Sequence, residues 1–279
     1  MYKIGSSDRP DLALAVVVGA GGMGMAIARR LGQSYRLLLA DRDAAALDRH
    51  KAVLRTDGFD VQTTQCDVTD ADDVASLVSA AAQIGPIRVI AHVVGLSPSM
   101  GDFRAIIAVN LLGAERIAHE FLPKVATSAC AIFISSMGGH TPVLTPALQT
   151  LTDAALELGF IDRLEAAVAE PRTPTLAYQI SKAAMNHMCR RDAFKWGERG
   201  ARIVSLSPGL IASPMGALEF ERQPVKHDLL AKTPLQREGT MLEIANVVEF
   251  LASDRASFIS GTDILVDGGL VGTLQQKTR

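Results

Sequence analysis

Apolar runs of strand length recur along the chain and alternate with segments whose apolar residues have helical spacing. Continuous apolar runs are typical of strands that are buried on both faces of a sheet. They lie at residues 13–18, 36–40, 89–94, 131–135, 203–207 and 264–266, with a weaker run at 61–65. The helical patterns lie at residues 23–31, 44–54, 71–83, 106–122, 177–196 and 242–251. This alternation predicts an α/β fold with about seven parallel strands and helices on both faces of the sheet.

The first connection between a strand and a helix distinguishes two α/β architectures. A (β/α)8 barrel alternates in the same way, but in a doubly wound, Rossmann-like sheet a nucleotide crosses the carboxyl end of the first strand, where glycines are needed. Gly19, Gly21 and Gly24 satisfy G-x-G-x-x-G there, with Gly22 and Met23 between them. Such glycines let backbone N–H groups approach a pyrophosphate at the helix N-terminus. We therefore predict a doubly wound sheet with a dinucleotide site at this loop.

Acidic residues at the ends of the second and third strands extend the cofactor hypothesis. Asp41 comes 20 residues after Gly21, where a carboxylate accepts hydrogen bonds from ribose hydroxyls and repels a 2′-phosphate. NAD is therefore favoured over NADP, although the neighbouring Arg42 leaves room for NADP, and Asp41 is also placed to cap the next helix. Asp67 follows the third strand and is placed either to reach the adenine amino group or to act as an ordinary N-cap or turn aspartate.

Tyr178 and Lys182 are the main candidates for chemistry. They are four residues apart in a predicted helix and therefore share one of its faces. A free tyrosine titrates at about pH 10, and a nearby cation lowers that pKa by favouring the phenolate. A separate strand leads into Ser135 and Ser136, and a serine hydroxyl at a strand's carboxyl end can donate to a substrate oxygen. Together these residues predict proton transfer to or from a hydroxyl group.

From about residue 12 to residue 270, the chain resembles the short-chain dehydrogenase/reductase family in the type and order of its motifs. The matching motifs are Gly19 to Gly24, Asp41, Asp67-Val68, Asn110, Ser135-Ser136, Tyr178 to Lys182, Pro208-Gly209 and Val266-Asp267-Gly268-Gly269. The resemblance implies an oxidoreductase that interconverts a secondary alcohol and a ketone with NAD. An NADP-dependent carbonyl reductase and a catalytically silent dinucleotide-binding sensor are the alternatives.

The resemblance also implies a role for each matching residue. Tyr178 would be the acid/base, Ser136 would orient the reacting oxygen, and Lys182 would lower the tyrosine pKa and hold the nicotinamide ribose. Asn110 would anchor a water in a proton relay, although it could instead bridge backbone groups within its helix. The resemblance assigns the remaining cofactor contacts to Val68, Val94, Gly95, Pro208, Gly209, Ile211 and Ser213.

Three features depart from the family pattern. The glycine loop is one residue shorter than T-G-x-x-x-G-x-G, and Val18 replaces its threonine. The usual Asn-Asn-Ala-Gly reads His-Val-Val-Gly from His92 onwards, and we expect His92 to be structural. Tyr178 follows Ser136 by 42 residues, a longer spacing than the family's usual one, which indicates an insertion at residues 141–173. An insertion at this place makes the chain similar to the subgroup of 3α-hydroxysteroid dehydrogenase/carbonyl reductase and coniferyl-alcohol dehydrogenase.

Two apolar segments are candidates for the wall of a substrate pocket. They contribute Leu144, Leu148, Leu151, Leu156, Leu158 and Phe160 from the insertion, and Met215, Leu218, Phe220 and Leu229 from residues 215–230. Such a wall predicts a bulky, hydrophobic alcohol or ketone, for example a hydroxysteroid or an aromatic alcohol. The same residues are equally suited to packing against a partner subunit, and we expect a homodimer or homotetramer. We also expect a helix-like segment at residues 148–168 and loose ends at residues 1–10 and 272–279.

Composition excludes several other classes of function. The 279 residues are enough for a single domain, 1–279, and 28 basic against 30 acidic residues give no positive field for nucleic acid or anionic lipid. The three cysteines have no C-x-x-C pairing and are expected to be free thiols in a reducing cytoplasm. An uncharged stretch at residues 12–28 is too short and too glycine-rich to span a membrane. Without H-E-x-x-H or G-x-S-x-G, metalloprotease and hydrolase functions are disfavoured, and no metal is expected.

Overall fold

Seven parallel strands form one sheet in the computed structural model, which describes residues 12–222 and 225–276. The strands are β1 (Leu14–Val18), β2 (Arg36–Asp41), β3 (Val61–Gln65), β4 (Ile87–His92), β5 (Val125–Ile134), β6 (Arg202–Pro208) and β9 (Asp263–Val266). Their order is β3-β2-β1-β4-β5-β6-β9. The sheet is open, with β3 and β9 at its edges, so the predicted doubly wound, Rossmann-like fold is confirmed and a closed barrel is excluded.

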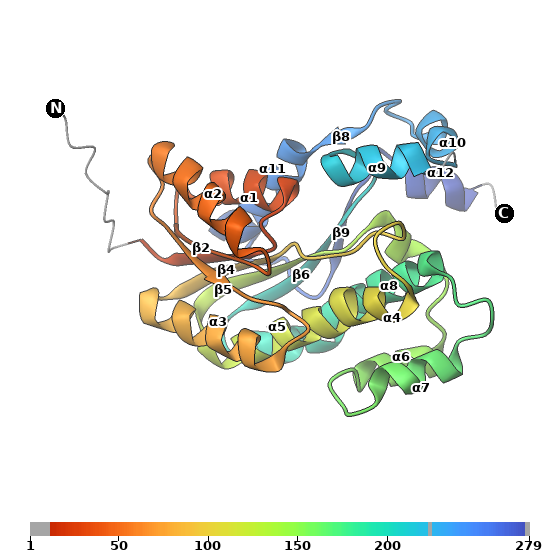
Figure 1. Cartoon of the computed structure of the whole chain (residues 1–279), viewed down its shortest axis with the longest axis horizontal. Coiled ribbons are helices and arrows are strands. Elements are labelled where there is room, and N and C mark those ends of the chain that lie inside the picture. The colour runs from red at the N-terminus through yellow and green to blue at the C-terminus, as the bar shows by residue number, and fades with distance from the viewer. Residues whose placement is uncertain (1–11, 223–224, 277–279) are drawn as a thin grey trace.

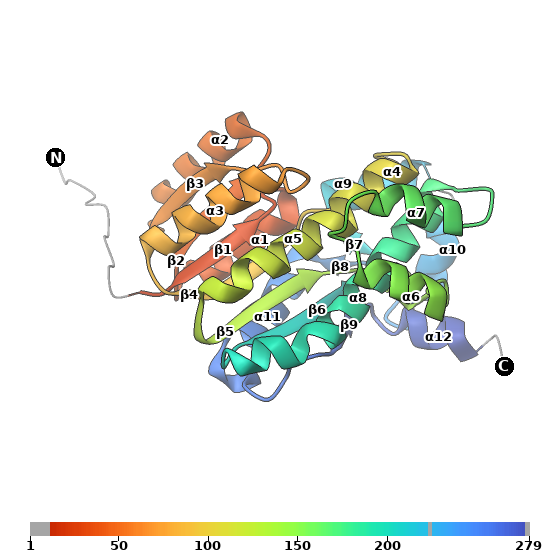
Figure 2. The same ribbon diagram turned by 90° about the horizontal axis from the view of Figure 1, so that it is seen from below.

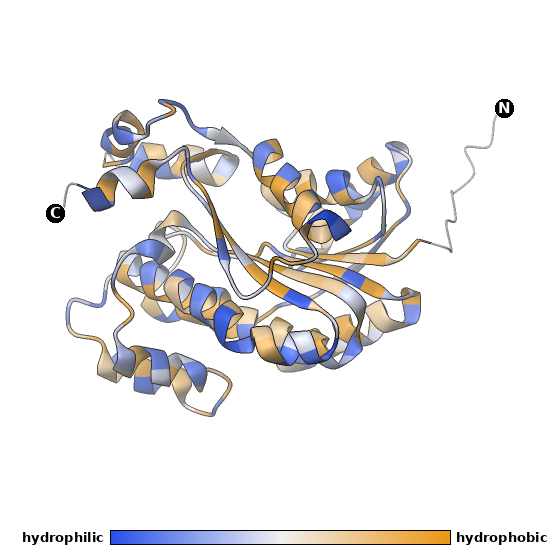
Figure 3. Cartoon of the chain, turned by 180° about the vertical axis from the view of Figure 1, so that it is seen from behind, coloured by the Kyte–Doolittle hydropathy of each residue, from blue (hydrophilic) through white to orange (hydrophobic). Residues whose placement is uncertain are grey.

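Helices cover both faces of the sheet (Figures 1 and 2). One layer contains α1 (Gly22–Leu31), α2 (Ala44–Thr56) and α11 (Met241–Ala252), and the other contains α3 (Ala71–Ile84), α5 (Gly113–Phe121) and α8 (Pro174–Glu198). Successive residues of β1 enter opposite layers, since Val16 belongs to the core under α3, α5 and α8, and Val17 to the core under α1 and α11. Because both faces are buried, the central strands are mostly apolar (Figure 3).

The helical pattern at residues 106–122 is interrupted in the structure. It divides into α4 (Phe103–Ile107), a widened π turn at Ala108–Leu112, and α5. The predicted helix is therefore present, but with a π turn that the apolar spacing did not reveal. π turns inside helices occur frequently at functional sites, and this one carries Asn110.

The insertion folds into two helices instead of one helix-like segment. After the short turn η3 (Met137–His140), the chain forms α6 (Pro146–Asp153) and α7 (Phe160–Ala167). The break comes at Gly159, which has a φ of 72° that favours glycine. Both helices lie outside α4 and α8 (Figure 2). Phe160 of α7 is buried in an apolar cluster with residues of α4 and α8, and Leu148 of α6 packs against that cluster. The insertion therefore packs against its own subunit.

The final part of the chain builds a small cap at one end of the sheet (Figure 1). It contains β7 (Ile211–Ala212), α9 (Pro214–Arg222), α10 (Val225–Lys232), β8 (Gly239–Thr240) and α12 (Leu270–Gln276). Residues 272–276 were expected to be a loose end, and α12 corrects that expectation; residues 1–10 and 277–279 lie outside the described part. Within residues 12–222 and 225–276, no helix has the length and apolar character needed to cross a membrane.

Candidate active site

A cavity of about 580 Å³ lies at the carboxyl ends of the central strands. Loops after β1, β4, β5 and β6 all contribute to its wall, as expected for a doubly wound sheet. Every residue that the sequence assigned to the cofactor lines this cavity: Gly19, Gly21, Gly22, Met23, Gly24, Asp41, Arg42, Asp67, Val68, Val94, Gly95, Tyr178, Lys182, Pro208, Gly209, Ile211 and Ser213. Ser136 lines it as well, whereas Asn110 stands behind the wall.

The glycine loop brings the start of α1 against β1 and β4. Gly19 has a φ of 100°, and a Cβ there would lie 2.8 Å from the backbone nitrogen of Val94. A Cβ on Gly24 would lie only 1.8 Å from the carbonyl oxygen of Gly19. A Cβ on Gly21, by contrast, would meet no atom within 4 Å. Gly19 and Gly24 are therefore required by packing, and Gly21 leaves the backbone open where the helix N-terminus begins.

Asp41 joins the end of β2 to the glycine loop. Its carboxylate accepts hydrogen bonds from the backbone N–H groups of Ala20, at 2.8 Å, and Asp43, at 3.0 Å. The cap of α2 is Asp43, which accepts from the N–H of Ala46 at 2.9 Å. The alternative that Asp41 caps this helix is therefore wrong, and the carboxylate faces the cavity from a fixed position.

Asp67 is no helix cap, because Asp70 occupies that position on α3, but it is a turn aspartate, which was the other form of the structural alternative. The Asp67 carboxylate accepts hydrogen bonds from the N–H and the hydroxyl of Thr69, at 2.8 and 2.7 Å. Burial alone would raise the Asp67 pKa, but the Thr69 hydrogen bonds, with smaller contributions from Arg42 and Arg116, lower it below its ordinary value. Asp67 is thus a fixed, charged acceptor in the cavity wall.

Tyr178 and Lys182 lie together on α8, as the spacing predicted. The Lys182 Nζ atom is 5.8 Å from the centre of the Tyr178 ring and donates a hydrogen bond of 2.8 Å to the carbonyl oxygen of Ile134. Burial lowers the Lys182 pKa to about 7. The loss of solvation thus weakens the cation that was expected to favour the phenolate.

In the protein without a cofactor, the Tyr178 pKa is raised, so the predicted lowering of this pKa is wrong there. Burial raises the Tyr178 pKa to about 12, a hydrogen bond with Ser136 opposes this rise, and the charge of Glu219 adds to it. At neutral pH, Tyr178 is therefore a phenol that can donate a proton.

The two serines after β5 have different partners. The Ser136 hydroxyl, besides its bond with Tyr178, accepts from the N–H of Gly138 at 3.1 Å and begins the turn η3. Ser135 instead donates its hydroxyl hydrogen to the carbonyl oxygen of Lys182, at 3.1 Å, and so ties α8 to β5. The geometry supports Ser136 as the serine that faces the phenol.

Asn110 bridges the loop that follows β4. Its side-chain oxygen accepts from the N–H of Leu96 at 2.7 Å, and its side-chain nitrogen donates to the carbonyl oxygen of Leu96 at 2.9 Å. Asn110 therefore does bridge backbone groups, as the alternative proposed, but its bridge joins the π turn to the loop after β4 and does not lie within one helix. The bridge positions Gly95 and Leu96 in the cavity wall, and the role of Asn110 toward a water stays a prediction.

His92 is buried beneath the cavity at the end of β4. Its ring centre lies 5.5 Å from that of Phe133, and neither ring nitrogen has a hydrogen-bond partner among the residues described. Burial, aided by the charge of Lys182, lowers the His92 pKa to about 3. His92 does not line the cavity, in agreement with the structural role expected for it.

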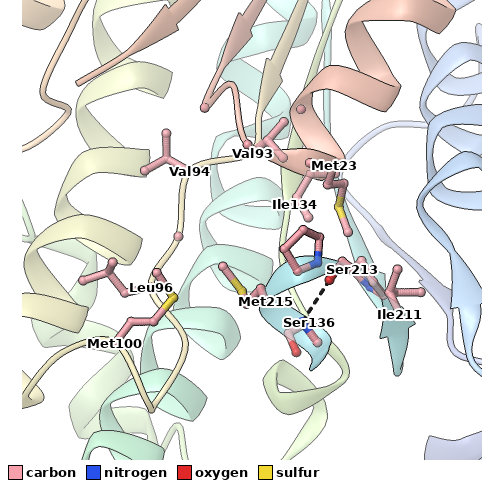
Figure 4. Close-up of a pocket in the computed structure, with 18 of the residues that line it drawn as sticks. Met23, Val93, Val94, Leu96, Met100, Ile134, Ser136, Ile211, Ser213 and Met215 are labelled. Carbon is pink, nitrogen blue, oxygen red and sulfur yellow. Dashed lines mark hydrogen bonds between the residues drawn. The ribbon is translucent and has the colours of Figure 1, made fainter. Parts of the chain in front are cut away.

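One end of the cavity has an apolar wall that includes Leu96, Met100 and Met215 (Figure 4). Leu218 and Phe220 of α9 belong to the same wall, but no residue of the insertion does, and neither does Leu229. The idea that the insertion walls the pocket is therefore wrong. Its apolar side chains either pack against α4 and α8 or face outward, as Leu158 does with 98% of its surface exposed.

Sequence reasoning missed two charged residues of the cavity wall. Glu219 of α9 and Lys226 of α10 both line the cavity and form an ion pair of 2.8 Å. No motif marks them, but the helix that carries Glu219 has a sequence signal. The Ser213 hydroxyl accepts from the N–H of Gly216 at 3.0 Å, and Pro214 follows at the first helical position. Serine followed by proline is a typical helix start.

Two family models match most of the chain between them. Residues 13–149 match the model for short chain dehydrogenases, and residues 160–271 match the model described as enoyl-(acyl carrier protein) reductase. The short-chain dehydrogenase/reductase bsc3 of Alternaria brassicicola is 36% identical over 271 residues, which cover 94% of this chain and 97% of that relative. The chain belongs to the short-chain dehydrogenase/reductase family. It is therefore an oxidoreductase, and the predicted similarity to the hydroxysteroid dehydrogenase subgroup stays a prediction.

Further members of the family are similar over nearly their whole length. Galactitol 2-dehydrogenase (L-tagatose-forming) of Cereibacter sphaeroides is 32% identical, with 94% of this chain and 96% of the relative covered. The crystal structure of a short-chain dehydrogenase/reductase from Brucella melitensis, described as a glucose/ribitol dehydrogenase, superposes with a TM-score of 0.73 at 26% identity, covering 92% of this chain and 96% of the other. The family and the fold thus rest on both sequence and structure.

Proposed function

We propose that this chain interconverts a secondary alcohol and a ketone with NAD as its redox partner. The observation that carries the proposal is one cavity with two chemical ends. The glycine loop and Asp41 line one part of its wall, and Ser136, Tyr178 and Lys182 line another. The nicotinamide cofactor supplies the acceptor or donor of hydride, and the protein supplies binding, orientation and proton transfer.

The residues of the cofactor end fit a dinucleotide. The open backbone at Gly21 and the N-terminus of α1 suit a pyrophosphate. Asp41 suits the adenosine ribose of NAD, because its carboxylate would repel the additional 2′-phosphate of NADP. Arg42 lines the same cavity and supports NADP as the alternative cofactor, for a carbonyl reductase.

At the other end of the cavity, Tyr178, Ser136 and Lys182 have separate roles in proton transfer. In ketone reduction, the Tyr178 phenol donates its proton to the carbonyl oxygen, and the Ser136 hydroxyl orients that oxygen by a hydrogen bond. In alcohol oxidation, the Tyr178 phenolate accepts the hydroxyl proton, and Lys182 in its ammonium form stabilises the phenolate. The elevated Tyr178 pKa of about 12 favours the reduction direction at neutral pH.

The apolar wall favours a bulky, hydrophobic substrate such as a hydroxysteroid or an aromatic alcohol. Leu96, Met100 and Met215 offer contacts that a small polar polyol would not use. One relative is named for its action on galactitol, a polar alcohol. The test of the proposal therefore compares kcat/KM for hydrophobic alcohols with kcat/KM for polar alcohols. Hydrophobic alcohols are expected to have the higher kcat/KM.

The test is turnover of a panel of alcohols and ketones, followed as absorbance of the reduced cofactor with NAD and NADP in turn. We expect hydrophobic secondary alcohols to react with NAD at a kcat/KM at least about tenfold above that with NADP. The reverse cofactor preference would support the NADP-linked carbonyl reductase instead. Binding of NADH without turnover of any substrate would support the silent dinucleotide-binding sensor.

A further inference from the structure

An ion pair stands in the apolar end of the cavity, and the proton-transfer chemistry does not use it. Glu219 and Lys226 contact each other at 2.8 Å, with only 15% and 18% of their side chains exposed. Their neighbours in the wall include Leu218 and Phe220. The two charges come from different helices, α9 and α10, and both line the cavity that contains Tyr178.

Fold stability does not account for this pair. Removing two charges from water costs about as much as their mutual attraction returns, and a well-packed apolar pair often serves a helix contact equally well. The exposed pair of Arg163 and Glu157, at 3.0 Å, has 42% and 67% of its side chains in solvent and carries no such cost. A largely enclosed ion pair in a cavity wall is therefore placed where the cavity's ligand can use it.

The pair also has unused hydrogen-bonding capacity. A carboxylate offers about four acceptor sites and an ammonium group three donors, and the mutual contact uses one of each. Within residues 12–222 and 225–276, neither side chain has another ion-pair or hydrogen-bond partner. A ligand hydroxyl can satisfy both, because it donates to the carboxylate and accepts from the ammonium group.

We propose that Glu219 and Lys226 bind a second hydroxyl group of the substrate, so that the preferred substrate is a hydroxyketone or diol on an apolar carbon frame. The inference rests on the proposed function, since it concerns the same cavity. The apolar wall binds the carbon frame, Ser136 and Tyr178 bind the reacting oxygen, and the ion pair binds the other oxygen. The charge of Glu219 also acts on Tyr178 through space, so the two polar positions are close enough for one substrate to join them.

Binding to the protein saturated with NADH tests this without requiring turnover. The probes are 1-tetralol, tetralin-1,2-diol and tetralin-1,4-diol, which share one carbon frame, and their dissociation constants are read from the fluorescence of bound NADH. We expect at least one diol to bind about tenfold more tightly than 1-tetralol, the effect of one hydrogen bond to a charged group. The ratio of the 1-tetralol and diol dissociation constants should fall to about one in the double variant Glu219→Leu/Lys226→Met, because the second hydroxyl loses both polar partners.

Two further variants show whether a lost preference comes from the missing ion pair or from misfolding of the variant. Glu157→Leu/Arg163→Met removes the exposed ion pair of the insertion, away from the cavity, and should keep the full preference for the diol. Glu219→Gln keeps the volume of the side chain and should lose part of the preference, even if the apolar double variant folds poorly. Melting temperature and NADH affinity are measured for each variant.

Equal affinities for the diols and 1-tetralol in the wild type, including no binding of any of them, would overturn the inference. A diol preference that survives in Glu219→Leu/Lys226→Met and in Glu219→Gln would overturn it as well. Failure of the proposed function would give a different result. In that case the diol preference would still depend on the ion pair, but no secondary alcohol, including these three, would be oxidised with NAD+ or NADP+.

Discussion

The Nζ atom of Lys182 lies 5.8 Å from the centre of the Tyr178 ring, while its hydrogen bond of 2.8 Å goes to the carbonyl oxygen of Ile134. The lysine is thus anchored to β5, the strand that leads into Ser136. A second bond, from the Ser135 hydroxyl to the carbonyl oxygen of Lys182, ties the helix backbone to the same strand end. The phenol, the amine and the serine are therefore held in one rigid unit.

The protonation state of this unit predicts different pH dependences for the two directions. Because the Tyr178 pKa is raised to about 12, the phenolate fraction at lower pH increases about tenfold with each pH unit. Lys182 stabilises the phenolate in its ammonium form, and with a pKa of about 7 this form decreases about tenfold with each pH unit above 7. We therefore expect kcat/KM for alcohol oxidation to rise with pH up to about 7 and to stay nearly level above it. That for ketone reduction should stay nearly level up to about pH 7 and fall above it. Steady-state rates in both directions measure this. An oxidation rate that falls as the pH rises would argue against Tyr178 as the base.

Glu219→Gln should shift that oxidation profile toward lower pH. The Glu219 charge raises the Tyr178 pKa, so its removal lowers the pKa and gives more phenolate at any given pH. Glu157→Gln, which changes an exposed carboxylate of the insertion, serves as the control and should leave the profile in place. A shift of the Glu219→Gln profile toward higher pH would contradict the electrostatic account.

The glycine loop predicts two different outcomes for two alanine substitutions. Gly24→Ala places a methyl group 1.8 Å from the Gly19 carbonyl oxygen, and we expect it to lower the free energy of unfolding by about 3 kcal/mol. Gly21→Ala meets no atom within 4 Å, so it should keep the stability and weaken only the binding of NADH. Denaturant unfolding and NADH titration separate the two effects. Equal stability of both variants would show that the close contact at Gly24 is unimportant.

His92 predicts a loss of stability in acid. Its pKa is about 3 in the folded protein and about 6.5 when unfolded, so between these values the unfolded chain binds a proton that the folded chain does not. The stabilisation is complete above about pH 6.5 and is lost toward about pH 3, at about 1.4 kcal/mol per pH unit. His92→Leu should lack this component. Unfolding free energies of both proteins at several pH values test it, and parallel curves would contradict it.

The sheet and the glycine loop were predictable because they depend on local features of the sequence. A strand buried on both faces must be apolar at both Val16 and Val17, and the close approach at Gly24 leaves no alternative to glycine. Tyr178 and Lys182 were equally accessible, since helix periodicity alone places them on one face.

Other features depend on contacts between distant segments, and the sequence did not reveal them. The pair of Glu219 and Lys226 exists only because α9 and α10 meet over the cavity. The Tyr178 pKa depends on how completely the fold removes water from the phenol and from Lys182. The division of the insertion at Gly159 follows from a positive φ, and its packing against α4 and α8 follows from apolar faces on three separate helices.

The variant Tyr178→Phe tests the central claim most directly, because it removes one oxygen atom and keeps the ring. We expect unchanged melting temperature and NADH affinity, with kcat/KM lowered by at least about 10²-fold in both directions, the usual contribution of general acid–base catalysis. Turnover at nearly the wild-type rate, with the cofactor bound normally, would show that the proton is transferred by another group.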